Sequence, residues 1–365
     1  MILISSFDQR TNYSTSLSRA DKHYMARGRP SRETIYRRLI NALDELNERF
    51  GGLPSPKESE TVWSDIWHLE AHHSTALEGN TLVLREVAML LDQRRAVGAK
   101  PLKEYMEVEG YSDAARWVYG QALDPDDWSD GGLISLNEVR RIHYMAMTPV
   151  WGVAPHPDAT EAESPGGFRE HEIAEFDGGM TPPPWVEVPA MLTDWVADVV
   201  TLGEIVATGT ELDVPLPEQL ASLHHRFECI HPFIDGNGRS GRLTLNLVLV
   251  RLGYPPVVIF KKQRDAYLRG LQRSDEGDHG ALGEIIARAM LDNLNRFVVP
   301  NVAGPARLVP LTALADNQFS VPALRQAAQR GRLDATQGPD GIWRSSRHAV
   351  SNYAKTKHTR RPKAT

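Results

Sequence analysis

The twelve residues His231–Arg242, HPFIDGNGRSGR, combine a proton acceptor, a carboxylate, a glycine-rich turn and two arginines in one short segment. His231 can take a proton from a hydroxyl group, because the ordinary pKa of imidazole lies close to neutral pH. Asp235 offers the hard oxygen ligand that Mg²⁺ prefers together with phosphate oxygens. Gly236 and Gly238 let successive backbone N–H groups converge on an anion. The segment therefore predicts a site that handles the phosphates of a nucleotide.

The glycine turn is expected at the start of a helix. The apolar run that follows, LTLNLVLVRLG, ends at Gly253 and is typical of a buried helix with a glycine stop. Arg239 and Arg242 would lie in its first turns, where a positive charge opposes the helix dipole by about 0.3–1 kcal/mol. A polyphosphate would offset that cost, because guanidinium groups bind phosphates well. The alternative is an ordinary Asp-Gly-Asn turn with solvated arginines.

The residues before His231 predict a second helix that ends at this histidine. Leu220, Leu223, Phe227 and Ile230 have helical spacing. The negative end of the helix dipole would favour the protonated imidazole there and raise its basicity. Further upstream, Ser135 and Glu138 have the spacing of a capping box and predict another helix start.

The segment matches the HxFx(D/E)GNGRxxR signature of Fic-domain proteins at every specified position, so the chain resembles that family. The resemblance implies an enzyme that transfers AMP from ATP to a Ser, Thr or Tyr hydroxyl of a target protein and releases pyrophosphate. By the same resemblance His231 is the general base, Phe233 anchors the loop and Asp235 binds Mg²⁺. The implied nucleotide-binding residues are Gly236, Asn237, Gly238, Arg239 and Arg242.

Two more features follow from the resemblance. Residues 167–185 resemble the family's flap, a β-hairpin that presents the target protein by strand addition; the residues alone indicate only a short hairpin or loop. Tyr267 resembles the aromatic residue that often approaches the nucleotide base. The next position, often a second tyrosine, is Leu268 here.

The segment DIWHLEAHHSTALEGN predicts a helix over about residues 60–80. Glu78 would lie at its C-terminus, where a carboxylate is unfavourable unless it is paired. Ser74, Glu78 and Gly79 resemble the (S/T)xxxE(G/N) inhibitory motif of Fic proteins. That resemblance implies an autoinhibited enzyme in which Glu78 pairs with Arg242, and some family members also remove AMP with this glutamate. The alternative is a capped helix with a solvated glutamate.

Composition sets the wider expectations. The single cysteine, Cys229, fits a reducing cytoplasm. No secretion signal and no apolar run of membrane-spanning length is found, so we expect a cytoplasmic protein without a membrane partner. His68 and His72 stand four residues apart, but the HExxH order of a zinc protease is absent.

The C-terminal region has its own charge and pattern. The net charge of the chain is −6, yet residues 301–365 contain 11 Lys and Arg against 3 Asp and Glu. Residues 311–357 predict helix, turn, helix, short strand and helix, with Ser320 as a cap and Arg325, Arg330 and Arg332 outward. This pattern resembles a winged helix-turn-helix, with Trp343 in the wing, and implies DNA as a partner. The alternative is a small helical cap with a basic tail.

We therefore expect a mainly α protein: a Fic-type helical bundle with a β-hairpin flap and a small winged helix-turn-helix-like domain. The predicted divisions are residues 1–100 with the inhibitory helix, a catalytic core over 101–300, and a basic unit over 301–365. A helix over 32–50 packs on the inhibitory helix or forms a homodimer surface. Two other functions stay open: transfer of another phosphate-bearing group, and a DNA-binding regulator that senses a nucleotide.

Overall fold

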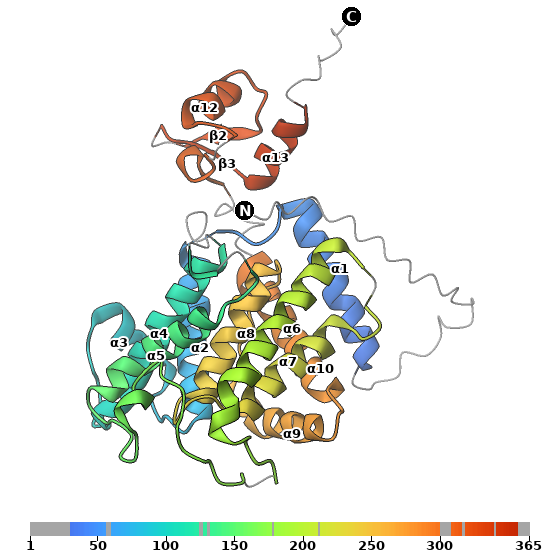
Figure 1. The fold of residues 1–365 in the computed structure, drawn as a ribbon. Helices are drawn as coiled ribbons and strands as arrows, with labels where there is room; N and C mark the ends of the chain where they lie inside the picture. Colours follow the sequence, from blue (N-terminus) through green and yellow to red (C-terminus); the bar gives the residue numbers. More distant parts are fainter. Residues whose placement is uncertain are drawn as a thin grey trace, which may run out of the picture.

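The computed structural model describes residues 30–55, 60–123, 127–129, 132–176, 179–210, 212–299, 308–315, 318–338 and 341–356. Most of them are helical (Figure 1). The helices of the main body are α1 (Arg32–Phe50), α2 (Glu60–Leu77), α3 (Leu84–Gln93), α4 (Leu102–Leu123), α5 (Leu136–Trp151), α6 (Val188–Thr208), α7 (Leu216–Ile230), α8 (Asn237–Arg251), α9 (Arg264–Asp275) and α10 (Gly280–Asn293). Among the described residues, no helix combines the length and apolarity that a membrane span needs.

Helix α8 is the centre of the main body, as the apolar run predicts. Its side chains from Leu243 to Val250 are buried, and α2, α4, α5 and α7 pack around it. A helix that is apolar on all sides must be enclosed in this way to keep its surface from water. The glycine turn of the motif therefore sits on an element held from several directions. Helix α5 begins where the capping box predicts, with the Ser135 hydroxyl accepting from the Glu138 N–H.

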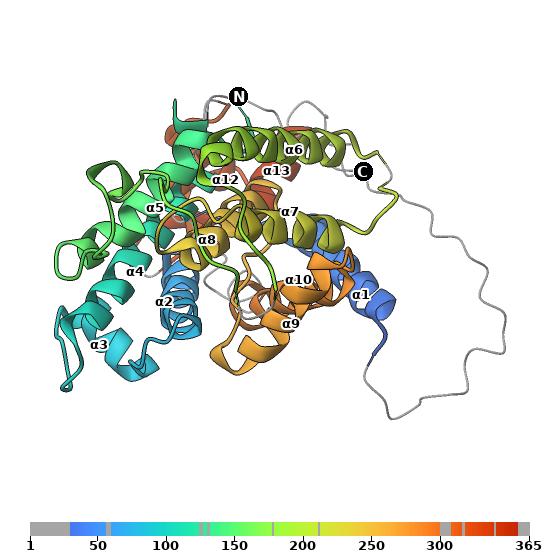
Figure 2. The ribbon, with the colours of Figure 1, turned by 60° about the horizontal axis from the view of Figure 1, so that its bottom comes forward.

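Helix α1 has the predicted bounds but not the predicted partner. The Ser31 hydroxyl caps its first turn, and Gly51, at φ +74°, ends it. Its apolar face, which includes Leu39 and Leu46, is buried mainly against α10 (Figure 2). The hydroxyl of Tyr36 on the same helix donates to Glu218 at 3.1 Å. This face is therefore covered within the chain, which removes it both as a support for the inhibitory helix and as a dimer surface.

The predicted β-hairpin flap is wrong for the part of residues 167–185 that the structure describes. Residues 167–176 and 179–184 contain bends and extended backbone but no strand, and a 3-10 turn begins at Trp185. Two backbone hydrogen bonds, from the Phe176 N–H to the Met180 carbonyl and from the Gly179 N–H to the Phe176 carbonyl, close a turn at its tip. The physical reason is the run Pro182–Pro184, because proline has no N–H to donate to a strand ladder.

The C-terminal residues form a small unit with a separate apolar core. Its elements are β1 (Val309–Pro310), α12 (Val321–Gln329), β2 (Ala335–Gln337), β3 (Trp343–Ser345) and α13 (Arg347–Thr356), with an antiparallel sheet in the order β1-β3-β2. The core contains Leu311, Leu314, Phe319, Leu324 and Val350, among others. Strand β3 contains Trp343 and pairs with β2 in antiparallel register; that these strands form the wing of a winged helix-turn-helix stays a prediction.

The first helix predicted in this unit is wrong. Residues 311–313 form only a single 3-10 turn. Leu311, Leu314 and Phe319 are nevertheless all buried in the core of this unit, and residues 316–317 between them lie outside the described residues. Ser320 precedes α12 as predicted, but its side chain makes no capping hydrogen bond. The basic tail 357–365 and the N-terminal residues 1–29 lie outside the described residues.

Candidate functional site

The loop between α7 and α8 holds His231 in an unusual backbone conformation. His231 has φ +50° and ψ 61°, the left-handed region that side chains other than glycine rarely adopt. Its N–H donates to the Phe227 carbonyl at 3.1 Å and so ends α7, as the helical spacing predicts. Strain of this kind persists only where the surroundings hold it, and it collects at functional sites.

The protonation state of His231 differs from the one predicted from the helix dipole. Burial lowers the pKa of His231 to about 4 and outweighs the hydrogen bond to the Glu228 carbonyl, which raises it. The imidazole is therefore neutral at pH 7. Because a carbonyl oxygen can only accept, the 3.2 Å contact between Nδ1 and the Glu228 oxygen places the proton on Nδ1. Nε2 then keeps the lone pair that can accept a proton.

The remainder of the loop is fastened by Asn237 and His143. The Asn237 side chain accepts from the Phe233 N–H at 2.8 Å and donates to the Phe233 carbonyl at 2.7 Å. The His143 ring stacks on the Phe233 ring with centroids 3.7 Å apart, and its Nε2 donates to the Asp235 carbonyl. Any contact of Asn237 with an anion would thus come from its backbone N–H, since its side chain is engaged within the loop.

Arg169 joins the loop to the flap segment, and sequence reasoning missed it. Its buried guanidinium donates to the carbonyls of His231 (2.8 Å), His171 (2.9 Å) and Pro183 (2.6 Å). Phe176 of the same segment lies 5.0 Å from His231, measured between ring centroids. One side chain therefore positions both the histidine and the segment that covers it. Nothing in the spacing of the sequence points to Arg169, because its acceptors are backbone carbonyls brought together by the fold.

Asp235 and Arg239 lie together where the loop joins the N-terminus of α8. Nη2 of Arg239 donates to Oδ1 of Asp235 at 3.0 Å, and the Gly236 N–H donates to the same oxygen. Burial opposes ionisation of Asp235, but Arg239, the Gly236 hydrogen bond and weaker neighbouring charges together outweigh it and lower the pKa of this carboxyl. Nε and Nη1 of Arg239 are buried without a hydrogen bond among the described residues, although Nη1 lies 3.9 Å from Oε1 of Glu107. Guanidinium donors without a hydrogen-bond acceptor at a helix N-terminus suit an anionic ligand.

Arg242 is held by the helix that the sequence predicts to be inhibitory. Its Nη2 donates to Oε1 of Glu78 at 2.7 Å and to the Ser74 carbonyl at 3.0 Å, and its Nε donates to the Ser74 hydroxyl at 2.7 Å. Burial would raise the pKa of Glu78, but the charge and hydrogen bond of Arg242 lower it. Glu78 follows directly after α2, as predicted, and Gly79 continues the turn at φ +103°. The structure thus contains the predicted Glu78–Arg242 pair.

Tyr267 lies in surroundings that differ from those predicted. Its side chain is 3% exposed, and its hydroxyl lies 2.7 Å from Nε2 of His224. Glu228, one turn after His224 on α7, is also largely buried, and burial raises the pKa of its carboxyl to about 7. In this structure Tyr267 is part of an internal polar cluster, since it has no open face on which a base could stack. Its neighbour Leu268 is on the surface.

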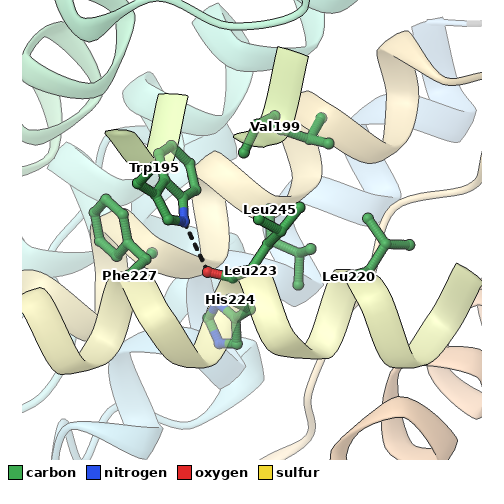
Figure 3. A pocket seen from close by; sticks show the side chains of 9 residues that line it. Trp195, Val199, Leu220, Leu223, His224, Phe227 and Leu245 are labelled. Carbon is green, nitrogen blue, oxygen red and sulfur yellow. Dashed lines mark hydrogen bonds between the residues drawn. The ribbon is translucent and has the colours of Figure 1, made fainter. Parts of the chain in front are cut away.

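A pocket between α6, α7 and α8 is lined mainly by apolar side chains, together with His224. Trp195 and Val199 of α6 face Leu220, Leu223 and Phe227 of α7 across it, and the Trp195 indole donates to the Leu223 carbonyl at 2.8 Å (Figure 3). Of the motif, only Gly241 contributes to its lining. The pocket therefore belongs to the packing of α6 on the central helices rather than to the nucleotide site.

Comparison with known proteins agrees with this geometry. Residues 133–249 match the model of the Fic/DOC family. Over these residues the chain is similar to that family. The matched residues include α5, α6, α7, most of α8 and every residue of the loop from His231 to Arg242.

Curated relatives of this chain are named as protein adenylyltransferases. The chain is 28% identical to protein adenylyltransferase Fic of Drosophila yakuba over 309 residues. These aligned residues make up 84% of this chain and 53% of the relative. It is also 28% identical over 276 residues to protein adenylyltransferase fic-1 of Caenorhabditis briggsae, covering 75% and 49%. The chain thus spans about half the length of the curated relatives it matches.

Solved structures share the fold. Fic-1 (residues 134–508) from C. elegans superposes with a TM-score of 0.55 at 24% identity, over 73% of this chain and 70% of that one. A Fic-domain signaling protein from Bacteroides thetaiotaomicron gives a TM-score of 0.56 at 24% identity, over 74% and 98%. Helices that form a Fic bundle are therefore what position the site.

Proposed function

We propose that this Fic-domain chain transfers AMP from ATP to a hydroxyl side chain of another protein and releases pyrophosphate. The observation that carries the proposal is the loop itself. A neutral histidine with a free Nε2 lone pair stands on the same short segment as a carboxylate and a helix N-terminus with two arginines. The names of the curated relatives support the same activity.

The chain's own residues account for the transfer as a reaction of positioning and charge. His231 accepts the proton of the target hydroxyl at Nε2, and the hydroxyl oxygen attacks the α-phosphorus while pyrophosphate leaves on the opposite side. Backbone N–H groups of Asn237 and Gly238 and the guanidinium of Arg239 stabilise negative charge on the phosphates. Asp235 is ionised and solvent-accessible, which fits the single carboxylate that Mg²⁺ needs beside phosphate oxygens; when bound, the ion would neutralise phosphate charge.

We further propose that the observed contact between Glu78 and Arg242 keeps the enzyme inhibited. Arg242 directs Nε and Nη2 at the end of α2, so neither of these groups is directed to a phosphate. Glu78 also occupies the space above Gly238, where a Cβ would come within 2.4 Å of its Oε1. ATP can use Arg242 fully only after the carboxylate moves away.

Transfer of label from ATP tests the proposed chemistry. Protein incubated with Mg²⁺ and ATP labelled at the α-phosphate should become labelled, whereas ATP labelled at the γ-phosphate should leave it unlabelled. The reason is that AMP retains only the α-phosphorus. Labelling from the γ-position would instead indicate a kinase, and an absence of label from either position would support a nucleotide-sensing role.

The pH dependence should reflect the buried state of His231. Because its pKa is about 4, the imidazole stays neutral across pH 5.5–8, and the transfer rate should fall only as the pH approaches 4. Glu228, with a pKa of about 7, can add an inflection of its own. Rates should therefore be compared with those of Glu228→Gln: an inflection near 6.5 that persists in this variant would show that His231 has an ordinary pKa.

A second function, DNA binding, is favoured by one observation in the C-terminal unit. Arg325, Arg330 and Arg332 are all exposed on or just after α12. Replacing the three by alanine should weaken binding to duplex DNA and reduce the slope of log K against log salt by about 0.9 for each phosphate that is no longer neutralised. The matched control is alanine at Arg37 and Arg38, which are exposed on α1. Equal effects of both sets would leave no role for this surface.

A further inference from the structure

A cluster of metal-binding side chains lies outside the loop, where α7, α9 and α10 meet. His225 and Cys229 stand one helical turn apart on α7, and Asp275 is the last residue of α9. Their atoms are close: Nε2 of His225 lies 2.7 Å from Oδ1 of Asp275 and 3.2 Å from Sγ of Cys229. Sγ of Cys229 lies 3.8 Å from the same Asp275 oxygen. None of these residues has a role in the proposed transfer reaction.

The geometry of the cluster excludes a catalytic triad. In a Cys-His-Asp relay the carboxylate and the thiol contact opposite nitrogens of the imidazole. Here both approach the same nitrogen, Nε2. Burial, together with Asp275, also raises the pKa of the Cys229 thiol to about 12, so the thiol is no activated nucleophile. Three donor atoms that converge on one point form a chelating group instead.

The spacing of the donor atoms agrees with a tetrahedral ion. Zinc bonds of about 2.0 Å to nitrogen and oxygen and about 2.3 Å to sulfur separate neighbouring ligand atoms by about 3.3–3.5 Å. The observed separations of 2.7, 3.2 and 3.8 Å lie on both sides of that range. Small side-chain rotations would therefore suffice to admit the ion, because Asp275 is at a partly exposed helix end.

A fourth candidate ligand stands beside the cluster. The ring of His279, at the start of α10, lies 5.7 Å from the ring of His225 between centroids. Its Nδ1 is buried and has no hydrogen-bond partner among the described residues. A buried polar atom without a partner is uncommon and calls for a ligand.

We propose that His225, Cys229 and Asp275 bind one Zn²⁺ ion, with His279 or a water molecule as the fourth ligand. Imidazole, thiolate and carboxylate are the ligands that zinc uses in proteins. When the zinc–sulfur bond forms, the Cys229 proton passes to solvent. The ion would tie α7 to α9 and α10, and α7 is the helix that ends at His231. The site is a positioning device and does not depend on the reaction at the loop.

Metal titration of the full chain tests the proposal. Chelator-treated protein should bind one equivalent of Zn²⁺, and Co²⁺ in its place should give a thiolate-to-cobalt charge-transfer band. Cys229→Ser should abolish that band and weaken zinc binding by at least about 100-fold. Asp275→Asn, a change at a partly exposed position, should weaken binding by about tenfold or more and leave the circular dichroism spectrum unchanged.

A control separates this site from incidental histidine binding. His68 lies 3.6 Å from Asp92, so it forms a comparable imidazole–carboxylate pair without a thiol. His68→Gln should bind zinc as the unaltered chain does. The proposal is overturned if less than one equivalent binds, if the cobalt band is absent, or if Cys229→Ser binds zinc as tightly as the parent. These readouts do not involve ATP, so their failure is distinct from failure of the transferase proposal.

Discussion

Replacing Glu78 with glycine is expected to raise AMP transfer by about 10- to 100-fold. The carboxylate makes a charge-assisted hydrogen bond of 2.7 Å to Arg242, and such bonds contribute about 1.5–3 kcal/mol. If the inhibited state is favoured by that amount, removing the carboxylate shifts the population of the competent state by about a factor of ten for each 1.4 kcal/mol. The measurement is the initial rate of labelling from α-labelled ATP.

Two further variants make the result specific. Ser74→Ala removes one hydrogen bond that Arg242 donates to an uncharged hydroxyl, and should raise the rate by a smaller factor, about three- to tenfold. Glu109 pairs with Arg94 at 2.8 Å on another part of the surface, so Glu109→Gln is a control that removes one carboxylate charge from a different ion pair. Only the change at Glu78 should activate. Unchanged labelling in a folded Glu78→Gly protein would sink the autoinhibition proposal.

Loss of the His231 imidazole is expected to reduce AMP transfer by about 100- to 10,000-fold, the usual contribution of a general base. ATP binding should change little, because the phosphate-binding groups belong to α8 and its N-terminus. Rate and affinity should be measured separately, the first by labelling and the second by calorimetry with ATP and Mg²⁺, in the Glu78→Gly background.

The backbone at His231 decides which substitution is informative. Alanine is strained at φ +50°, so His231→Ala changes the loop as well as the base. Asparagine tolerates this conformation better and carries no basic nitrogen, so His231→Asn isolates the chemical role. If His231→Asn retains transfer, the histidine is not the base; if it loses ATP binding as well, its role is to hold the loop.

Local pattern was enough to predict the elements that carry the site. Capping residues and apolar spacing placed α1 from Arg32 to Phe50, and the same signals placed Ser135 before α5 and His231 after α7. These features depend on residues within a few positions of one another. The partner of α1 did not follow from such signals, because an apolar face shows that a helix is covered but not by what.

Some features of the candidate site could be predicted from the sequence, and others depend on the fold. The sequence contains the motif and the pairing of Glu78 with Arg242, since each has a charge that its own helix end disfavours. It contains no sign of Arg169, whose acceptors are carbonyls from separate segments. The pKa of His231 was predicted in the wrong direction, because burial depends on the whole fold and outweighs the dipole of one helix. Tyr267 was misplaced for the same reason.

The contact between Glu78 and Gly238 has a consequence for how the inhibition can be relieved. A Cβ added to Gly238 would lie within 2.4 Å of Oε1 of Glu78. The carboxylate therefore fills volume beside the glycine turn as well as neutralising Arg242. Salt screens charge but does not empty space. Ionic strength alone should therefore be a poor activator, and physiological release would require a movement of the end of α2, such as a partner pulling on the chain around Gly79.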